Sequence, residues 1–338
     1  MLVKTRPHFL LLCWLATFWV AGKAVGQGMG SFPMSIFENS PLTNGQAYNG
    51  FLTDSTQSIF KRDALVIDEQ VVTGGMIGGT IPLVADLKSF NASIVISPIR
   101  RLIVKGGYNS NTLAYPESLK LIGTSGSDAL KNTSYYGSVG YKAHVFFPLT
   151  FNVSLVQNQI ENAALFKEKF TQVNAGASAQ LGKLRIGILI LNANKAVIKG
   201  AFNPTEADSL ALEMYGSNGR YEYQIEPLYI FPVSYTFNAS SIDAELEVAP
   251  QVSYGVGKAY NSFPISLSIF SKVGLGGSVS YRYVSESSLR SYLPKTGWAT
   301  SIYYRKGSVS IGYALSKASF FRTIFNHQVF LTYQIRRR

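Results

Sequence analysis

Few side chains in this sequence are of the types that carry out acid–base, nucleophilic or metal chemistry. Histidine occurs three times, and the single cysteine is Cys13. His144 lies an even number of residues from Ser138 and Lys142, so on a strand these side chains would share one face, where an imidazole could act as a general base. A lone histidine on a strand is more often structural than catalytic. His8 lies within the predicted signal peptide described below, and His327 is far from His144 in the sequence. We therefore predict no catalytic residue, and two distant histidines make a zinc site improbable.

The sequence also gives no sign of a nucleotide-binding site. Gly182-Lys183 lacks the spacing of a phosphate-binding loop, so we predict that the protein uses no cofactor.

The first residues have the pattern of a secretory signal peptide. Lys4 and Arg6 precede an apolar stretch over residues 9–20, and the small residues Ala24 and Gly26 close it. We predict that residues 1–26 are removed, and Cys13 with them. The mature chain then has no thiol for a disulfide, a metal or a nucleophilic reaction.

The charge content is low for a soluble protein. Charged residues make up 15% of the sequence, whereas soluble proteins average about a quarter. Past residue 30 no apolar run reaches the length of about 20 residues that a transmembrane helix needs. The net charge is +12, but the cations are scattered, so we expect no nucleic-acid partner. We predict that Arg336, Arg337 and Arg338 contact lipid headgroups or lipopolysaccharide phosphates, and that residues 61–63 are solvated loop charges.

Apolar and polar residues alternate over many segments. One such segment has an apolar face formed by Val309, Ile311, Tyr313 and Leu315, and serine, glycine and alanine lie on the opposite face. This is the pattern of a strand with one apolar face. Similar segments recur along the chain, at 70–84, 90–99, 101–110, 135–146, 149–160, 170–181, 184–199, 228–238, 246–254, 265–269, 279–283, 298–304, 309–315 and 329–335. This pattern predicts an all-β protein, a single transmembrane antiparallel β-barrel of about 14 strands, with a range of about 12 to 16.

The connections between these segments give a second test of the barrel. Counting back from the C-terminus, their lengths mostly alternate between long and short, as in barrels with short periplasmic turns and long outer loops. A secreted β-sandwich, the main competing fold, has no reason to follow such an alternation. An even strand number places both ends of the barrel in the periplasm.

The segment before the first strand carries the most specific short pattern. It contains, in this order, the residues Asn39, Pro41, Leu42, Asn44, Ala47, Tyr48 and Gly50. This resembles the N-terminal Asn-Pro-Leu and Asn-Pro-Ala-Tyr-Ala-Gly pattern of the PorP/SprF family of Bacteroidota outer-membrane proteins. Ser40 is an insertion relative to that pattern, and Gly45-Gln46 stands in place of its second proline. The final strand, with His327 and Tyr333, is similar to the last strand of the same family.

The resemblance implies a function other than catalysis. It implies a bacterial outer-membrane component of a type IX secretion and gliding-motility system, which helps to export large adhesin-like proteins or to anchor them at the cell surface. The implied partners are secretion-system subunits in the periplasm or outer membrane, the secreted adhesin-like protein and outer-membrane lipid. We predict a signal peptide over 1–26, a periplasmic or plug segment over 27–69 that carries the docking residues, and a barrel over 70–338.

Two other functions remain open from the sequence. A passive outer-membrane channel or hydrophobic-solute transporter would have the same barrel, and the lumen would distinguish them: a plugged lumen favours docking or secretion, an open one favours diffusion. A barrel enzyme built on His144 is the other alternative, and we expect the protein not to be an enzyme.

Overall fold

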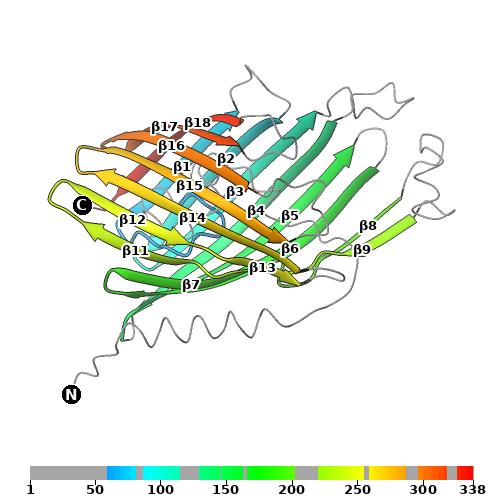
Figure 1. Cartoon of the computed structure of the whole chain (residues 1–338), viewed down its shortest axis with the longest axis horizontal. Coiled ribbons are helices and arrows are strands. Elements are labelled where there is room, and N and C mark those ends of the chain that lie inside the picture. The colour runs from blue at the N-terminus through cyan, green and yellow to red at the C-terminus, as the bar shows by residue number, and fades with distance from the viewer. Residues whose placement is uncertain are drawn as a thin grey trace.

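The structure is a computed structural model, and it describes residues 59–80, 87–114, 129–144, 146–162, 166–201, 220–254, 259–286, 296–317 and 326–337. All regular elements in these ranges are β-strands (Figure 1). Their bounds are β1 Val71–Thr80, β2 Leu87–Ile99, β3 Leu102–Ala114, β4 Ala129–His144, β5 Pro148–Asn162, β6 Phe166–Leu181, β7 Leu184–Leu191, β8 Val197–Ala201, β9 Arg220–Gln224, β10 Leu228–Ile230, β11 Val233–Asn238, β12 Ile242–Val248, β13 Gln251–Tyr254, β14 Ala259–Ser271, β15 Leu275–Glu286, β16 Thr296–Lys306, β17 Val309–Lys317 and β18 Asn326–Arg336.

The strands form one closed antiparallel barrel. β8 and β9 form a separate two-stranded sheet, and the other strands make the barrel wall. β1 closes the ring by pairing with β18, with Met76 opposite Thr332. The sheet has 16 labelled strands, but β10 with β11 and β12 with β13 each form one interrupted transmembrane strand, because β10 and β11 both pair with β7 and β12 and β13 both pair with β14. The barrel therefore has 14 transmembrane strands, which confirms the predicted fold.

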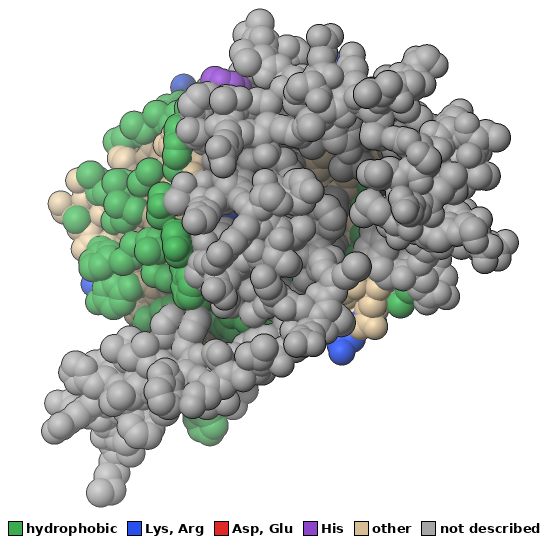
Figure 2. All heavy atoms as spheres, turned by 45° about the vertical axis from the view of Figure 1, so that its right-hand side comes forward, with side chains coloured by type: hydrophobic (Ala, Val, Ile, Leu, Met, Phe, Trp, Pro, Cys, Tyr) green, Lys and Arg blue, Asp and Glu red, His purple; other side chains and the backbone are tan. Residues whose placement is uncertain are grey.

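The two faces of the wall differ in chemistry as the alternation predicts. On β5, Phe151, Val153 and Leu155 are exposed on the outside, whereas Asn152 and Ser154 between them are buried. Figure 2 shows hydrophobic side chains gathered over the visible part of the outer wall. Burying the polar face around a lumen and presenting the apolar face to lipid satisfies both environments.

Within the described ranges, no helix is long and apolar enough to cross a membrane.

Prolines account for the two interrupted strands. Pro232 separates β10 from β11, and Pro250 separates β12 from β13. Proline has no N–H to donate to the ladder, so regular pairing stops there. The two breaks lie side by side, because the amide of Phe231 donates to the carbonyl of Pro250 over 2.9 Å.

The predicted strand over 184–199 is wrong as one continuous strand, because residues 192–196 are not in a strand and residues 197–199 belong to β8. β7 ends at Leu191, and Asn192 and Lys195 adopt positive φ angles of 59° and 50°. A left-handed backbone cannot continue a strand, so the chain turns and then forms the β8–β9 hairpin instead. The amide of Asn194 replaces the missing ladder partner of β6, because its Oδ1 accepts from Val173 N at 2.8 Å and its Nδ2 donates to Thr171 O at 2.9 Å.

Tight turns gather at the end of the barrel where β18 finishes. They include Gly182-Lys183, the residues 272–274 and Gly307-Ser308, and the C-terminus lies at the same end as the turn between β11 and β12 (Figure 1). Gly182 and Gly307 have φ angles of 65° and 60°, which side-chain-bearing residues rarely adopt. By the alternation of connections we expect this end to face the periplasm, and it is called the periplasmic end below.

Candidate functional site: a peptide segment inside the barrel

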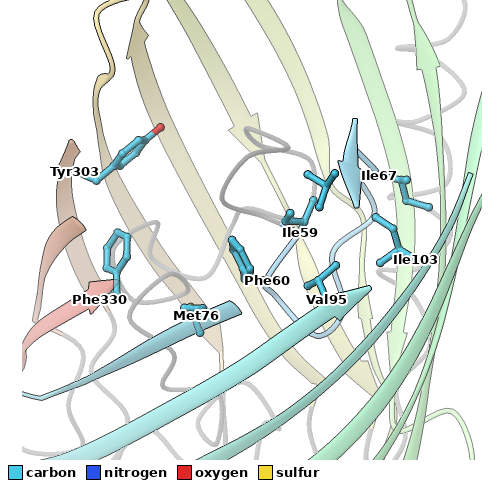
Figure 3. Packing of buried hydrophobic residues seen from close by; sticks show 9 residues of the cluster. Ile59, Phe60, Ile67, Met76, Val95, Ile103, Tyr303 and Phe330 are labelled. Atoms are coloured by element: carbon cyan, nitrogen blue, oxygen red, sulfur yellow. The ribbon is translucent and has the colours of Figure 1, made fainter. Parts of the chain in front are cut away.

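Residues 59–70, here called the lumen segment, lie inside the barrel just before β1. Ile59 and Phe60 are fully buried, and they pack among inward-facing side chains of one arc of the wall, from β16 through β18 and β1 to β3. Figure 3 shows Met76, Tyr303 and Phe330 on one side of them and Val95 and Ile103 on the other. The apolar cluster in the lumen therefore joins the segment to β1, β2, β3, β16 and β18.

Glycines in the wall make room for the apolar side chains of the lumen segment. A Cβ placed on Gly176 would lie 2.6 Å from Cδ2 of Leu65, and one placed on Gly140 would lie 3.3 Å from Cδ1 of Ile67. Any larger residue at Gly176 would thus overlap Leu65 or displace it. The wall and the segment are complementary in shape at these points.

Asp63 is the polar centre of the contact. Its carboxylate is buried, and it accepts hydrogen bonds from Ser154 Oγ at 2.5 Å and from Asn174 Nδ2 at 3.1 and 3.2 Å. Arg62 Nε lies 2.6 Å from the second oxygen. A buried carboxylate is stable only when its oxygens are paired in this way. β5 and β6 supply the two neutral donors because Ser154 and Asn174 are opposite each other in the ladder.

Side chains of the wall also bind the backbone of the lumen segment. Lys105 Nζ donates to Lys61 O at 2.9 Å, Asn152 Nδ2 donates to Ala64 O at 2.8 Å, and Ser178 Oγ donates to Leu65 O at 2.7 Å. An irregular segment has no ladder partners of its own, so these side chains satisfy its buried carbonyls. The segment is fixed in place by β3, β5 and β6 without becoming part of the sheet.

A cluster of charges at the periplasmic end holds the last residues of the lumen segment. Glu69 Oε1 lies 2.7 Å from Lys142 Nζ and 3.0 Å from His144 Nε2. The hydrogen bond from Lys142, and then that from His144, holds the pKa of Glu69 below its ordinary value. His144 therefore contacts a carboxylate at the rim of the barrel.

The C-terminal arginines bind the same end of the segment. Arg336 Nη2 lies 3.0 Å from Asp68 Oδ2, and Arg337 donates to the carbonyls of Glu69 and Ser97 at 2.9 Å each. Both arginines thus make contacts within the protein, and the predicted contact with lipid phosphates stays a prediction. Arg338 lies outside the described residues.

Of the site predictions made from the sequence, one cannot be compared with the structure and one is wrong. The predicted docking residues Asn39, Pro41, Leu42, Asn44, Ala47, Tyr48 and Gly50 all lie outside the described residues. The prediction that residues 61–63 are solvated is wrong, because Lys61 and Asp63 are buried in the lumen. Their partners on β5 and β6 were visible in the sequence only as polar members of alternating strands, with nothing to assign them to Asp63.

The remaining candidates for chemistry are engaged in structural contacts. His327 Nδ1 lies 2.6 Å from the hydroxyl of Tyr313 on the neighbouring strand. Within the described ranges, no three His, Cys, Asp or Glu side chains come together in a way that could hold a metal ion.

Comparisons with known proteins bear on the fold. No family model matches the sequence, and no curated protein matches it. Among solved structures, the chain is similar to the toluene transporter TbuX of Ralstonia pickettii, with a TM-score of 0.56 and 11% identity over 90% of this chain and 100% of that one. It is also similar to the monoaromatic hydrocarbon channel CymD, with a TM-score of 0.55 and 11% identity over 88% of this chain and 97% of that one.

At such identities the similarity shows the fold alone. The closed barrel, its apolar outer face and its polar lumen are those of outer-membrane barrels. The chain is a β-barrel protein of the bacterial outer membrane.

Proposed function

We propose that the protein is an outer-membrane channel for small solutes, and that the lumen segment controls its opening. The observation that carries this proposal is how the lumen segment is held. It lies inside the lumen, outside the sheet, and wall side chains hold it through a few hydrogen bonds to Asp63 and to its backbone carbonyls. A segment held by side chains can leave without breaking the ladder of the wall, whereas a wall strand cannot.

Two further points support a channel. The inner wall is polar over β2 to β6 and over β14 to β18, where serine, threonine, asparagine and glutamine predominate among the buried polar side chains. Such a wall suits water and solutes better than a packed protein core. The two structures of similar fold are named as a transporter and a channel, so the fold is compatible with transport.

The test is the conductance of the purified full chain in planar lipid bilayers. We expect small or rare current steps from the native protein and larger, longer steps from Asp63→Ala, in which the lumen segment loses its central contact. Heat-modifiable migration in gels would establish that both barrels are folded. A folded barrel that passes no current in either form would overturn the proposal.

The secretion function that the N-terminal resemblance implies stays a prediction. It rests on residues 39–50, outside the described part of the chain, and on no contact described above. It predicts that deleting residues 39–50 leaves a heat-modifiable barrel in the outer membrane but abolishes display of an adhesin-like protein at the cell surface. Display that persists in the deletion would contradict it, and loss of the barrel would make the segment structural.

A further inference from the structure

The inner wall carries a group of amide side chains on the outer side of the lumen segment. This group, here called the amide belt, comprises Asn91, Asn109, Asn111, Asn132, Asn158 and Gln172. Asn91 lies opposite Asn109, and Asn111 lies opposite Asn132, so the amides occupy facing positions on consecutive strands.

The order of residues along β5 places the belt relative to the segment. Asn152 and Ser154, which bind the lumen segment, are nearer the periplasmic turn than Asn158 is. A solute entering from the outside would therefore reach the belt before the lumen segment.

Asn132 shows that the belt has unused hydrogen-bonding capacity. Its side chain is 5% exposed, and neither Oδ1 nor Nδ2 has a hydrogen-bond partner among the residues that the structure describes. Leaving a buried amide unpaired costs on the scale of the full desolvation penalty, so such groups in native proteins are normally satisfied by water or a ligand. An amide that points into a lumen and has both its donor and its acceptor unused is suited to an incoming polar molecule.

The composition of the belt selects the class of that molecule. An amide offers one donor and one acceptor group, which matches a hydroxyl that both donates and accepts. Amides carry no net charge, so they cannot neutralise an ion that has lost its water. The ring of Phe170, opposite Asn158 in the ladder, adds a buried apolar surface beside them. Convergent polar groups next to an aromatic ring are the usual features of a small-molecule site.

We propose that the amide belt binds neutral polyhydroxylated solutes, with Asn132 as a direct ligand. This inference rests on the proposed channel function and names its solute class. It also separates this protein from the hydrocarbon channel and transporter of similar fold, because a hydrocarbon could not donate to or accept from the amide of Asn132.

The belt is joined to the lumen segment by a chain of hydrogen bonds. Asn158 Nδ2 donates to Gln172 Oε1 at 2.7 Å, and Gln172 Nε2 donates to Asn174 Oδ1 at 3.1 Å. Asn174 in turn donates to Asp63. A solute that competes for the amides of Asn158 or Gln172 therefore acts on the same network that seats the segment.

The experiment measures entry of solutes into liposomes that contain the full chain. The probes are glucose as a neutral hydroxylated solute, gluconate as its charged counterpart and toluene as a hydrocarbon. The test variant is Asn132→Leu, with Asn132→Ser as a second variant in case the first fails to fold. The matched control is Gln157→Leu, which removes an amide from the exposed outer face of β5.

We expect glucose entry to saturate in the native protein and the half-saturating concentration to rise about tenfold in Asn132→Leu, as for the loss of one to two hydrogen bonds. Gln157→Leu should behave as the native protein does. Glucose entry that is linear with concentration and unchanged in Asn132→Leu would overturn the proposal that the amide belt is a solute site. Water would then be the partner of the Asn132 amide. Saturable entry of toluene but not glucose would overturn the solute class.

Direct binding separates this inference from the channel proposal. Titration of glucose into the detergent-solubilised full chain should show binding that Asn132→Leu weakens, even if no current or flux is found. Flux without any such binding would overturn the belt and leave the channel intact.

Discussion

Asp63 is the residue on which the seat of the lumen segment depends most. Its carboxylate accepts from Ser154 and Asn174 and pairs with Arg62, all in a buried setting. Hydrogen bonds to a charged group contribute about 1.5 to 3 kcal/mol each. Its wall partners bind it through their side chains and keep their own ladder pairing, so its removal should act on the segment before it acts on the barrel.

Replacing Asp63 by alanine should therefore unseat the segment. Loss of two charge-assisted hydrogen bonds weakens binding of the lumen segment to the wall by on the order of 3 kcal/mol. This is about a hundredfold in the equilibrium constant between the bound and the released segment. Single-channel recordings should show a higher open probability. Asp243→Ala is the matched control, because Asp243 bonds Asn238 at the exposed rim, away from the segment. Equal recordings from the two variants would contradict the assigned role of Asp63.

Glu69 makes the periplasmic end of the segment sensitive to acid. Its bonds to Lys142 and His144 hold its pKa below the ordinary value of 4.5, so the carboxylate favours the seated state. That contribution is present in full above pH 4.5 and is lost as the pH falls through the lowered value. Channel opening should increase over this acid range, and Glu69→Gln should remove the increase. A pH response that survives in Glu69→Gln would assign it to another group.

At the scale of elements, shape complementarity supplies a test that does not involve charge. Gly176→Ala brings a Cβ to 2.6 Å from Leu65 Cδ2, and the neighbouring Ile188 O and Leu189 Cδ1 are each 3.0 Å away. Leu65→Ala instead leaves a void, which costs about 2 to 5 kcal/mol for a buried leucine. Each single variant should open the channel more often. The double variant should recover part of the closed state, and additive effects in the double-mutant cycle would contradict direct contact.

The strands themselves follow from the sequence because each has one face toward lipid and one toward the lumen. That alternation is local, so the segment at 309–315 and its counterparts predict the wall and its 14 strands. The end of β7 could not be predicted from the sequence, because the turn at Asn192 depends on backbone angles that asparagine permits but does not require. A proline such as Pro232 interrupts a ladder without ending the transmembrane strand, which the alternation alone does not reveal.

The site was much less accessible to sequence reasoning than the wall. Asp63 lies 91 residues from Ser154 and 111 from Asn174, so no local pattern connects them. A Lys-Arg-Asp triplet before the first strand has the composition of a solvated loop, and only the closed ring brings it into the lumen. The amides of the belt are ordinary polar members of their strands until the register places them opposite one another.

At the scale of the whole molecule, closure of the barrel joins the two ends of the described chain. β1 and β18 pair along their lengths, and Arg337 N donates to Gln70 O at 2.7 Å beyond the last ladder pair. The side chains of Arg336 and Arg337 then bind Asp68, the Glu69 carbonyl and Ser97. The same residues thus complete the ring and hold the lumen segment, so barrel stability and channel closure should change together.

The double variant Arg336→Ala/Arg337→Ala tests this coupling. It removes one partly exposed ion pair and two side-chain bonds to carbonyls, which together contribute about 2 kcal/mol. We expect a lower temperature for conversion of the heat-modifiable form and a higher open probability in bilayers. Arg100→Ala/Arg101→Ala removes the same charge from an exposed turn at the same end of the barrel and should change neither. If both pairs lower the conversion temperature equally, net charge and not the link between the chain ends stabilises the barrel. If the C-terminal pair lowers that temperature without affecting opening, closure of the ring and seating of the segment are independent.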